Sequence, residues 1–240
     1  MSIVTIARQF RGPPNSGNGG YVCGLLGKEM DGPSTVILRA IIPLDAPLNL
    51  AREDSRVTLT NADGTLIAEA GPASALPDVP PPPSFHQAQT GSAAYEKVQS
   101  EYTFHPPCFT CTPLRADGDG LRVFAGSYGA EPGQIAAAWT PHPAFADRDG
   151  LVPAEIVWAA LDCPGSFAWL DKLGRTGGLL GTMTAEILRR PVIGAPYIVT
   201  AWPLEQSGRK YSSGVALFTK NGELLARGQQ IWIGRATPDA

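Results

Sequence analysis

The sequence LVPAEIVWAALDCPGSFAWL occupies residues 151–170. Its apolar residues recur at intervals of three and four, as at Ile156, Val157, Ala160 and Leu161, which is the spacing of a helix with one apolar face. Segments rich in Val, Ile, Leu and Thr follow and predict strands: GLLGTMTAEILRRP at 178–191, PYIVTAWPLEQ at 196–206 and YSSGVALFTKNGELLARGQQIWIG at 211–234. The second half of the chain is therefore predicted to be one helix followed by a sheet.

The first half of the chain shows the same order of elements. A helix pattern is again followed by strand patterns: GGYVCGLLGKEM at 19–30, TVILRAIIP at 35–43 and RVTLTNADGTLIAEAG at 56–71. Both halves also contain a pair of residues that accepts positive φ and lets two strands fold back as a hairpin, Asp63-Gly64 and Asn221-Gly222. Two similar modules are therefore predicted.

These modules cover residues 1–71 and 134–240, and two segments separate them. Residues 72–92, PASALPDVPPPPSFHQAQTGS, contain consecutive prolines and no apolar periodicity, which predicts an extended linker on the surface. Residues 93–133 form a connecting region with a Cys-x2-Cys pair. Its short apolar runs have no assignable partners in the sequence.

Composition narrows the class of protein. Gly 27 and Pro 23 in 240 residues are more than long helices tolerate, which predicts many strands joined by turns. The net charge is -3, and the sequence has no basic block that would bind nucleic acid or a membrane surface. No segment reaches the roughly 20 apolar residues of a membrane span, and the N-terminus lacks the apolar run of a signal peptide. The sequence has Cys 4, and these are too scattered for a disulfide framework, which fits a reducing compartment; the protein is therefore expected to be cytoplasmic.

The order and spacing of these motifs resemble the double hotdog arrangement of acyl-CoA thioesterases, in particular the acyl-CoA thioesterase II type. The resemblance spans most of residues 10–71 and 134–235. It rests on four motifs: Gly19-Gly20-x-Val22-x-Gly24-x-Leu26, WAALDCPGSFAWL at 158–170, ILRRP at 187–191 and LLARGQQ at 224–230. It implies an α+β fold, a double hotdog made of two fused modules in which an antiparallel sheet wraps a helix.

In that family an aspartate, a glutamine and a threonine hold the attacking water, and amides at a helix start polarise the thioester carbonyl. Carried onto this sequence, the resemblance assigns catalytic roles to Asp162 and Gln230, without a metal or a cofactor. The threonine position falls on Ala185. The adjacent Thr184 is predicted to contact the substrate, although on a strand it faces the opposite side unless a bulge shifts the register.

Other interpretations of the same residues stay open. Pro164 follows Asp162 closely, and an aspartate before a proline often caps a helical turn. One of Gln229 and Gln230 must point outward from a strand, and a strand glutamine is often an edge or surface residue. A carboxylate can accept the proton of an attacking water and an amide can orient that water, so both residue types fit thioester hydrolysis.

Asn18, Gly19 and Gly20 begin the first predicted helix and are candidate substrate contacts. Free backbone amides at a helix start carry partial positive charge and can face a carbonyl or phosphate oxygen. The alternative is that Asn18 is only the N-cap of this helix. Each glycine costs a helix roughly 1 kcal/mol relative to alanine, which favours the close approach of another group at these positions.

His105, Cys108 and Cys111 place three possible zinc ligands in the short segment HPPCFTC. A fourth ligand is not evident nearby, and His86 and His142 can serve only if their loops fold toward the pair. A Cys-x2-Cys pair also occurs in packed turns and in redox pairs. The packed turn is preferred over zinc and over redox chemistry, so no metal is predicted.

The predicted function is hydrolysis of an acyl thioester, carried by coenzyme A or by an acyl carrier, with water that Asp162 activates. The alternative is a non-catalytic acyl-thioester-binding hotdog protein, because the threonine is missing. An enoyl-thioester hydratase comes third, since it needs an Asp and His pair and the histidines lie outside the predicted helices. The resemblance implies a homo-oligomer, and no nucleic-acid or membrane partner is predicted.

Overall fold

The computed structural model describes residues 1–73, 75–101, 108–174 and 178–234. In these ranges the chain forms the helices α1 (Gly19–Gly27), α2 (Phe85–Glu101) and α3 (Ala154–Leu173), and the short 3-10 helices η1 (Arg8–Phe10) and η2 (Pro143–Phe145). The strands are β1 (Ser2–Thr5), β2 (Ser34–Leu38), β3 (Pro47–Glu53), β4 (Arg56–Thr60), β5 (Leu66–Pro72), β6 (Gly126–Ser127), β7 (Ile135–Trp139), β8 (Gly178–Ile187), β9 (Tyr197–Ser207), β10 (Lys210–Thr219) and β11 (Leu224–Gly234). Among the described residues, no helix has the length and apolar content needed to cross a bilayer.

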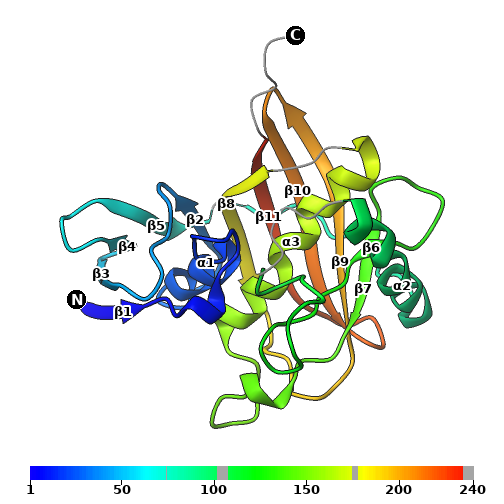
Figure 1. Ribbon diagram of the computed structural model, residues 1–240, viewed down its shortest axis with the longest axis horizontal. Coiled ribbons are helices and arrows are strands. Elements are labelled where there is room, and N and C mark those ends of the chain that lie inside the picture. The colour runs from blue at the N-terminus through cyan, green and yellow to red at the C-terminus, as the bar shows by residue number, and fades with distance from the viewer. Residues whose placement is uncertain (74, 102–107, 175–177, 235–240) are drawn as a thin grey trace.

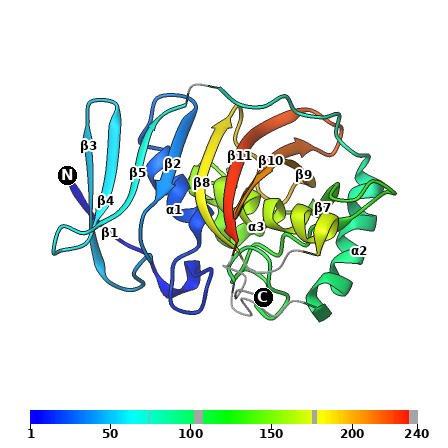
Figure 2. The same cartoon turned by 90° about the horizontal axis from the view of Figure 1, so that it is seen from above.

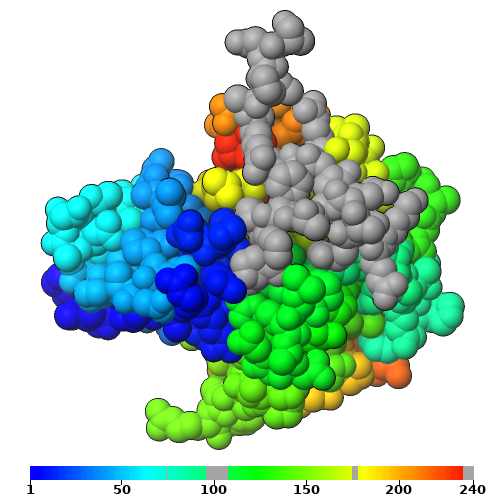
Figure 3. Space-filling view, in the orientation of Figure 1, coloured from blue at the N-terminus to red at the C-terminus, as the bar shows by residue number. Residues whose placement is uncertain are grey.

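All these strands belong to one antiparallel sheet that runs through both halves of the chain (Figure 1). The strand order is β1-β3-β4-β5-β2-β8-β11-β10-β9-β7-β6. The halves join where β2 pairs with β8, with Thr35 opposite Thr184 and Val36 opposite Met183. In the space-filling view the blue-to-cyan part of the chain, which carries α1 and β1 to β5, accordingly lies on one side of the molecule, and the green-to-red part lies mostly on the other (Figure 3). The module boundaries at residues 71 and 134 stay a prediction.

Helices α1 and α3 lie together against one face of the sheet (Figure 2). Three glycines of α1 make this approach possible. A Cβ atom on Gly20 would stand 2.6 Å from Cβ of Asp162, and one on Gly27 would stand 2.7 Å from the ring of Trp158. A Cβ atom on Gly24 would overlap the backbone of Glu155. The predicted close approach at the glycine-rich helix is therefore made by α3.

The main core surrounds this helix pair. Its buried side chains come from both helices and from strands of both halves, which ties the halves into one packing unit. They include Val22, Leu26, Val36, Leu59, Val157, Leu161, Met183, Val215 and Leu217.

The expectation of an extended linker over residues 72–92 is wrong for its last part, because α2 begins at Phe85. Ser84 and Gln87 form a capping box that starts this helix. Ser84 Oγ accepts from Gln87 N–H at 3.2 Å, and Gln87 Oε1 accepts from Ser84 N–H at 2.8 Å. The helix then packs at the end of the sheet formed by β6, β7 and β9, where Ala88 lies against Ala136, Ile198, Ala216 and Phe218.

Gly24→Val is expected to lower the free energy of unfolding by roughly 3 kcal/mol, the upper end of the usual range for overpacking, because the added side chain overlaps Glu155. Gly71→Val is the matched control, since a Cβ atom on Gly71 meets nothing within 4 Å. Valine also suits the strand position of Gly71. Urea unfolding of both variants measures the difference. Equal stability of the two variants would contradict the helix contact described here.

Candidate functional site

Asp162 lies on α3 where this helix crosses the start of α1, and it is 3% exposed. Its Oδ2 accepts hydrogen bonds from Nδ2 of Asn18 at 2.7 Å and from the backbone N–H of Gly20 at 3.1 Å. Its Oδ1 has no hydrogen-bond partner among the described residues. The carboxylate therefore stands at the positive end of the α1 dipole, with one oxygen held and the other buried without a partner among the described residues.

Asn18 connects Asp162 to two other parts of the chain. Its Oδ1 accepts from the backbone N–H of Tyr21 at 2.8 Å, which confirms Asn18 as the N-cap of α1. Its Nδ2 donates to Asp162 and, at 3.2 Å, to Oγ1 of Thr110. Both ends of the amide are thus engaged, which holds it in one orientation.

Thr110 is a buried polar residue of the site that no sequence motif indicates. It lies in the turn at residues 108–112, and its Oγ1 donates to the backbone carbonyl of Ala159 on α3 at 2.8 Å. In the sequence it is a polar residue between two cysteines, and the Cys-x2-Cys spacing points to the thiols and not to this hydroxyl. The turn thus brings a hydroxyl to the site from the region that connects the two halves.

Burial, and after it the negative charge that Cys108 carries when ionised, raise the pKa of Asp162 to about 7. The hydrogen bonds from Gly20 and Asn18 act in the opposite direction. A carboxyl group with a pKa in this range can both accept and return a proton near neutral pH.

Gln230 on β11 is fully buried, so it is the inward-pointing member of the Gln229–Gln230 pair. Its Nε2 donates to the backbone carbonyls of Leu161 at 2.8 Å and of Asp162 at 3.1 Å. Its Oε1 accepts from Nε1 of Trp232 at 2.8 Å. The amide of Gln230 is therefore occupied at both ends.

These hydrogen bonds serve α3 beside an interior proline. Pro164 lies inside the helix and has no N–H to donate to the carbonyl of Ala160, and Gln230 binds the carbonyls of the next two residues, Leu161 and Asp162. Gly165 leaves room for the glutamine, since a Cβ atom there would overlap Oε1 of Gln230. The structure thus brings Gln230 to the backbone of Asp162, whereas its hydrogen bonds do not reach the carboxylate. A water-holding role for Gln230 stays a prediction.

Thr184 and Ala185 on β8 face opposite sides of the sheet. Ala185 is buried on the same side as Met183, whose Sδ lies 3.9 Å from Nε2 of Gln230. Oγ1 of Thr184 lies 2.9 Å from Oγ1 of Thr35 on β2. The bulge between β8 and β11 lies nearer the start of β8 and leaves this alternation intact. Thr184 is therefore not brought to Asp162.

Gly19 and Gly20 both have close neighbours within the protein. A Cβ atom on Gly19 would stand 3.0 Å from the side chain of Leu180 and 3.1 Å from that of Leu38. The N–H of Gly20 is engaged by Asp162. Contact of these glycines with a substrate stays a prediction.

No protein-family model matches the chain, and no curated protein matches it in sequence. Solved structures match nearly all of it. A candidate thioesterase from Novosphingobium aromaticivorans is 17% identical, with 98% of this chain and 95% of that chain covered and a TM-score of 0.60. A TesB protein from Mycobacterium avium subs paratuberculosis is 13% identical, with 98% and 92% covered and a TM-score of 0.62. A hot dog fold protein from Alicyclobacillus acidocaldarius is 15% identical, with 98% and 93% covered and a TM-score of 0.61.

The chain has a double hotdog fold. This confirms the predicted fold class, with α1 and α3 as the two helices and one antiparallel sheet around them. Identities this low establish the fold alone, so the activity of this double hotdog protein has to be argued from its own site.

Gln230→Leu is expected to lower the free energy of unfolding by about 1 to 3 kcal/mol, because it removes a donor from the carbonyls of Leu161 and Asp162 and leaves the indole N–H of Trp232 without its acceptor. Gln229→Leu is the matched control, since Gln229 is partly exposed and makes one side-chain hydrogen bond to a serine hydroxyl, at 2.9 Å. The same change there should cost about 1 kcal/mol or less. Denaturant unfolding followed by circular dichroism compares them, and equal losses would argue against this supporting role of Gln230.

Proposed function

We propose that the chain hydrolyses an acyl thioester, with Asp162 as the base that activates water. The observation that carries the proposal is the pairing of the Asp162 carboxylate with the N–H of Gly20, at 3.1 Å, on the start of a helix. Thioester hydrolysis needs these two groups, one to take the proton of the water and one to donate to the carbonyl oxygen. A neighbour with the same fold is named a candidate thioesterase, which agrees with this reaction class.

In the proposed reaction the carbonyl oxygen of the thioester replaces Oδ2 of Asp162 as the acceptor of the Gly20 N–H. A water molecule bound at Oδ1 of Asp162 attacks the carbonyl carbon and gives its proton to the carboxylate. The C–S bond then breaks, and the leaving sulfur takes that proton, so that a carboxylic acid and a free thiol are formed. Asn18 holds the aspartate throughout by its hydrogen bond of 2.7 Å.

The acyl carrier in this proposal is coenzyme A or an acyl-carrier protein, as the sequence resemblance implies. A homo-oligomeric state and a cytoplasmic location stay predictions from the sequence. The pairing of Asp162 with Gly20 lies within one chain.

A second candidate is binding of an acyl thioester without hydrolysis. Two observations favour it: the amide of Gln230 is fully engaged, and Ala185 offers no hydroxyl at the threonine position. A hydratase fits less well. His86 lies exposed on α2, His142 is the N-cap of η2, and His105 lies outside the described residues. The described part of the chain thus gives Asp162 no histidine partner.

Asp162→Asn is expected to lower thioester hydrolysis by at least about 100-fold, the lower end of the usual contribution of an acid–base group. The asparagine keeps an oxygen that can accept from Asn18 and Gly20, so the fold should be retained, but it cannot take a proton from water. Release of free coenzyme A from a panel of acyl-CoA chain lengths, separated by chromatography, measures the rate. Asp171→Asn on the same helix is the matched control and should keep full turnover, since Asp171 binds Ser127 and Gly133 instead.

Unchanged turnover in Asp162→Asn would exclude Asp162 as the base. Binding of acyl-CoA by the unaltered chain, with no release of coenzyme A at any chain length, would favour the second candidate. Circular dichroism of both variants separates loss of chemistry from loss of fold.

A further inference from the structure

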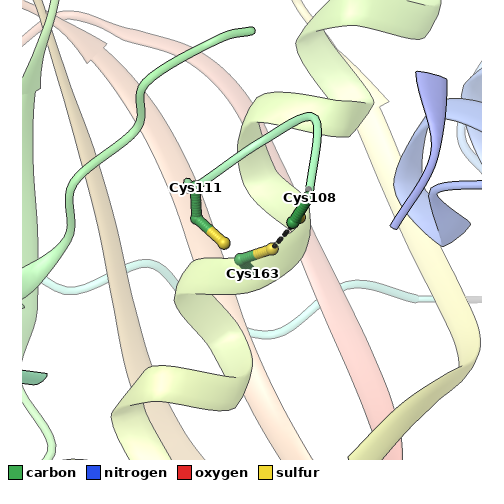
Figure 4. A group of neighbouring side chains, drawn as sticks. All are labelled: Cys108, Cys111 and Cys163. Atoms are coloured by element: carbon green, nitrogen blue, oxygen red, sulfur yellow. Dashed lines mark hydrogen bonds between the residues drawn. The ribbon is translucent and has the colours of Figure 1, made fainter. Parts of the chain in front are cut away.

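The structure brings Cys163 of α3 to the Cys-x2-Cys pair in the turn at residues 108–112. The Sγ atoms of Cys108, Cys111 and Cys163 all lie within 4.8 Å of one another, and those of Cys108 and Cys163 are 3.5 Å apart. Figure 4 shows the three side chains directed at the same space from two separate segments. All three cysteines are free thiols.

We propose that Cys108, Cys111 and Cys163 form a binding site for a zinc-type divalent metal ion, held through three thiolates. Zinc binds thiolate sulfur at about 2.3 Å in a tetrahedron, which sets neighbouring sulfur atoms about 3.8 Å apart. The observed limits of 3.5 Å and 4.8 Å span this separation, so small side-chain rotations complete the site. The HPPCFTC segment alone offers His105, Cys108 and Cys111 as ligands, whereas in the proposed site Cys163 is the third ligand in place of His105.

The turn also directs backbone donors at one of the sulfur atoms. The backbone N–H groups of Cys111 and Thr110 donate hydrogen bonds to the sulfur of Cys108. The thiolate is the form of cysteine that binds metals. Packing alone accounts for buried thiols, but it does not require three of them to converge beside amides that favour a thiolate.

Aromatic side chains enclose the three thiols. Tyr95 stacks on Phe124 with ring centroids 5.1 Å apart, and its ring lies 5.6 Å from that of Phe167. An apolar shell of this kind limits solvent access to a metal site. Cys163 is partly exposed, whereas Cys108 and Cys111 are buried. In the proposed site the fourth coordination position is taken by a solvent molecule.

Metal binding would tie the turn to α3. Each ligand thiol loses its proton to solvent when the ion binds. The same turn carries Thr110, which accepts from Asn18 and donates to Ala159. The ion would therefore fix the position of a hydroxyl group at the candidate site while making no contact with Asp162 itself.

The test uses the 240-residue chain under reducing conditions, with Co²⁺ as a spectroscopic probe and Zn²⁺ as a competitor. We expect about one Co²⁺ per chain, with thiolate-to-cobalt charge-transfer absorption and the visible bands of a tetrahedral ion, all removed by Zn²⁺. Cys108→Ala, Cys111→Ala and Cys163→Ala should each weaken binding by more than about 100-fold, since even changes outside the ligand set weaken metal sites by about 10–100-fold.

Cys23→Ala is the matched control, because Cys23 is a buried cysteine of α1 outside the cluster, and it should bind Co²⁺ like the unaltered chain. The proposal is overturned if the unaltered chain binds no Co²⁺, if the bound ion lacks charge-transfer absorption, or if Cys23→Ala weakens binding equally. A disulfide between two of the three cysteines, found by mass spectrometry of the protein as isolated, would also overturn it. Binding is measured by absorbance, so the result does not depend on thioester hydrolysis.

Discussion

The close crossing of α1 and α3 is the constraint on which the rest of the structure depends. Gly20, Gly24 and Gly27 let the two helices approach to backbone contact, and at the same crossing Asp162 accepts the N–H of Gly20. A larger side chain on α1 would separate the helices and would also remove the carboxylate from its donor. Because a buried carboxylate is costly without such donors, one contact supports both the packing of the core and the candidate chemistry.

Three consecutive residues of α3 take part in the candidate site, the cysteine cluster and the irregular part of the helix. Asp162 binds the start of α1, Cys163 meets the turn at residues 108–112, and Pro164 interrupts the helical hydrogen bonds. Gln230 donates to the carbonyls of Leu161 and Asp162. A segment that is irregular as a helix is thus held by partners from three other parts of the chain, and this explains why the local sequence DCPG sits inside a long helix.

Local patterns in the sequence predict much of this arrangement, and the rest depends on contacts between distant residues. Asn18 is recognisable as an N-cap from its neighbours alone, and the family resemblance indicates Asp162. The alternation of side chains along a strand does not show which of Gln229 and Gln230 points inward, because that depends on which face of the sheet packs against α3. Cys108 in the turn and Cys163 are separated by 55 residues in the sequence, so their contact is visible only in the fold. The four prolines before Ser84 indicate an extended segment, although Ser84 and Gln87 form the capping box that begins α2.

The junction between β2 and β8 has a consequence for folding of the newly made chain. Thr35 and Thr184, paired across it, are separated by 149 residues, and pairings between such distant segments form late. At a synthesis rate of about 5–20 residues per second, β2 would wait roughly 7 to 30 s for β8 to follow. During that interval the edge of β2 and the glycine face of α1 have no partner within the chain. The junction that makes the two halves one sheet is therefore also where a nascent chain is most open to pairing with a neighbour.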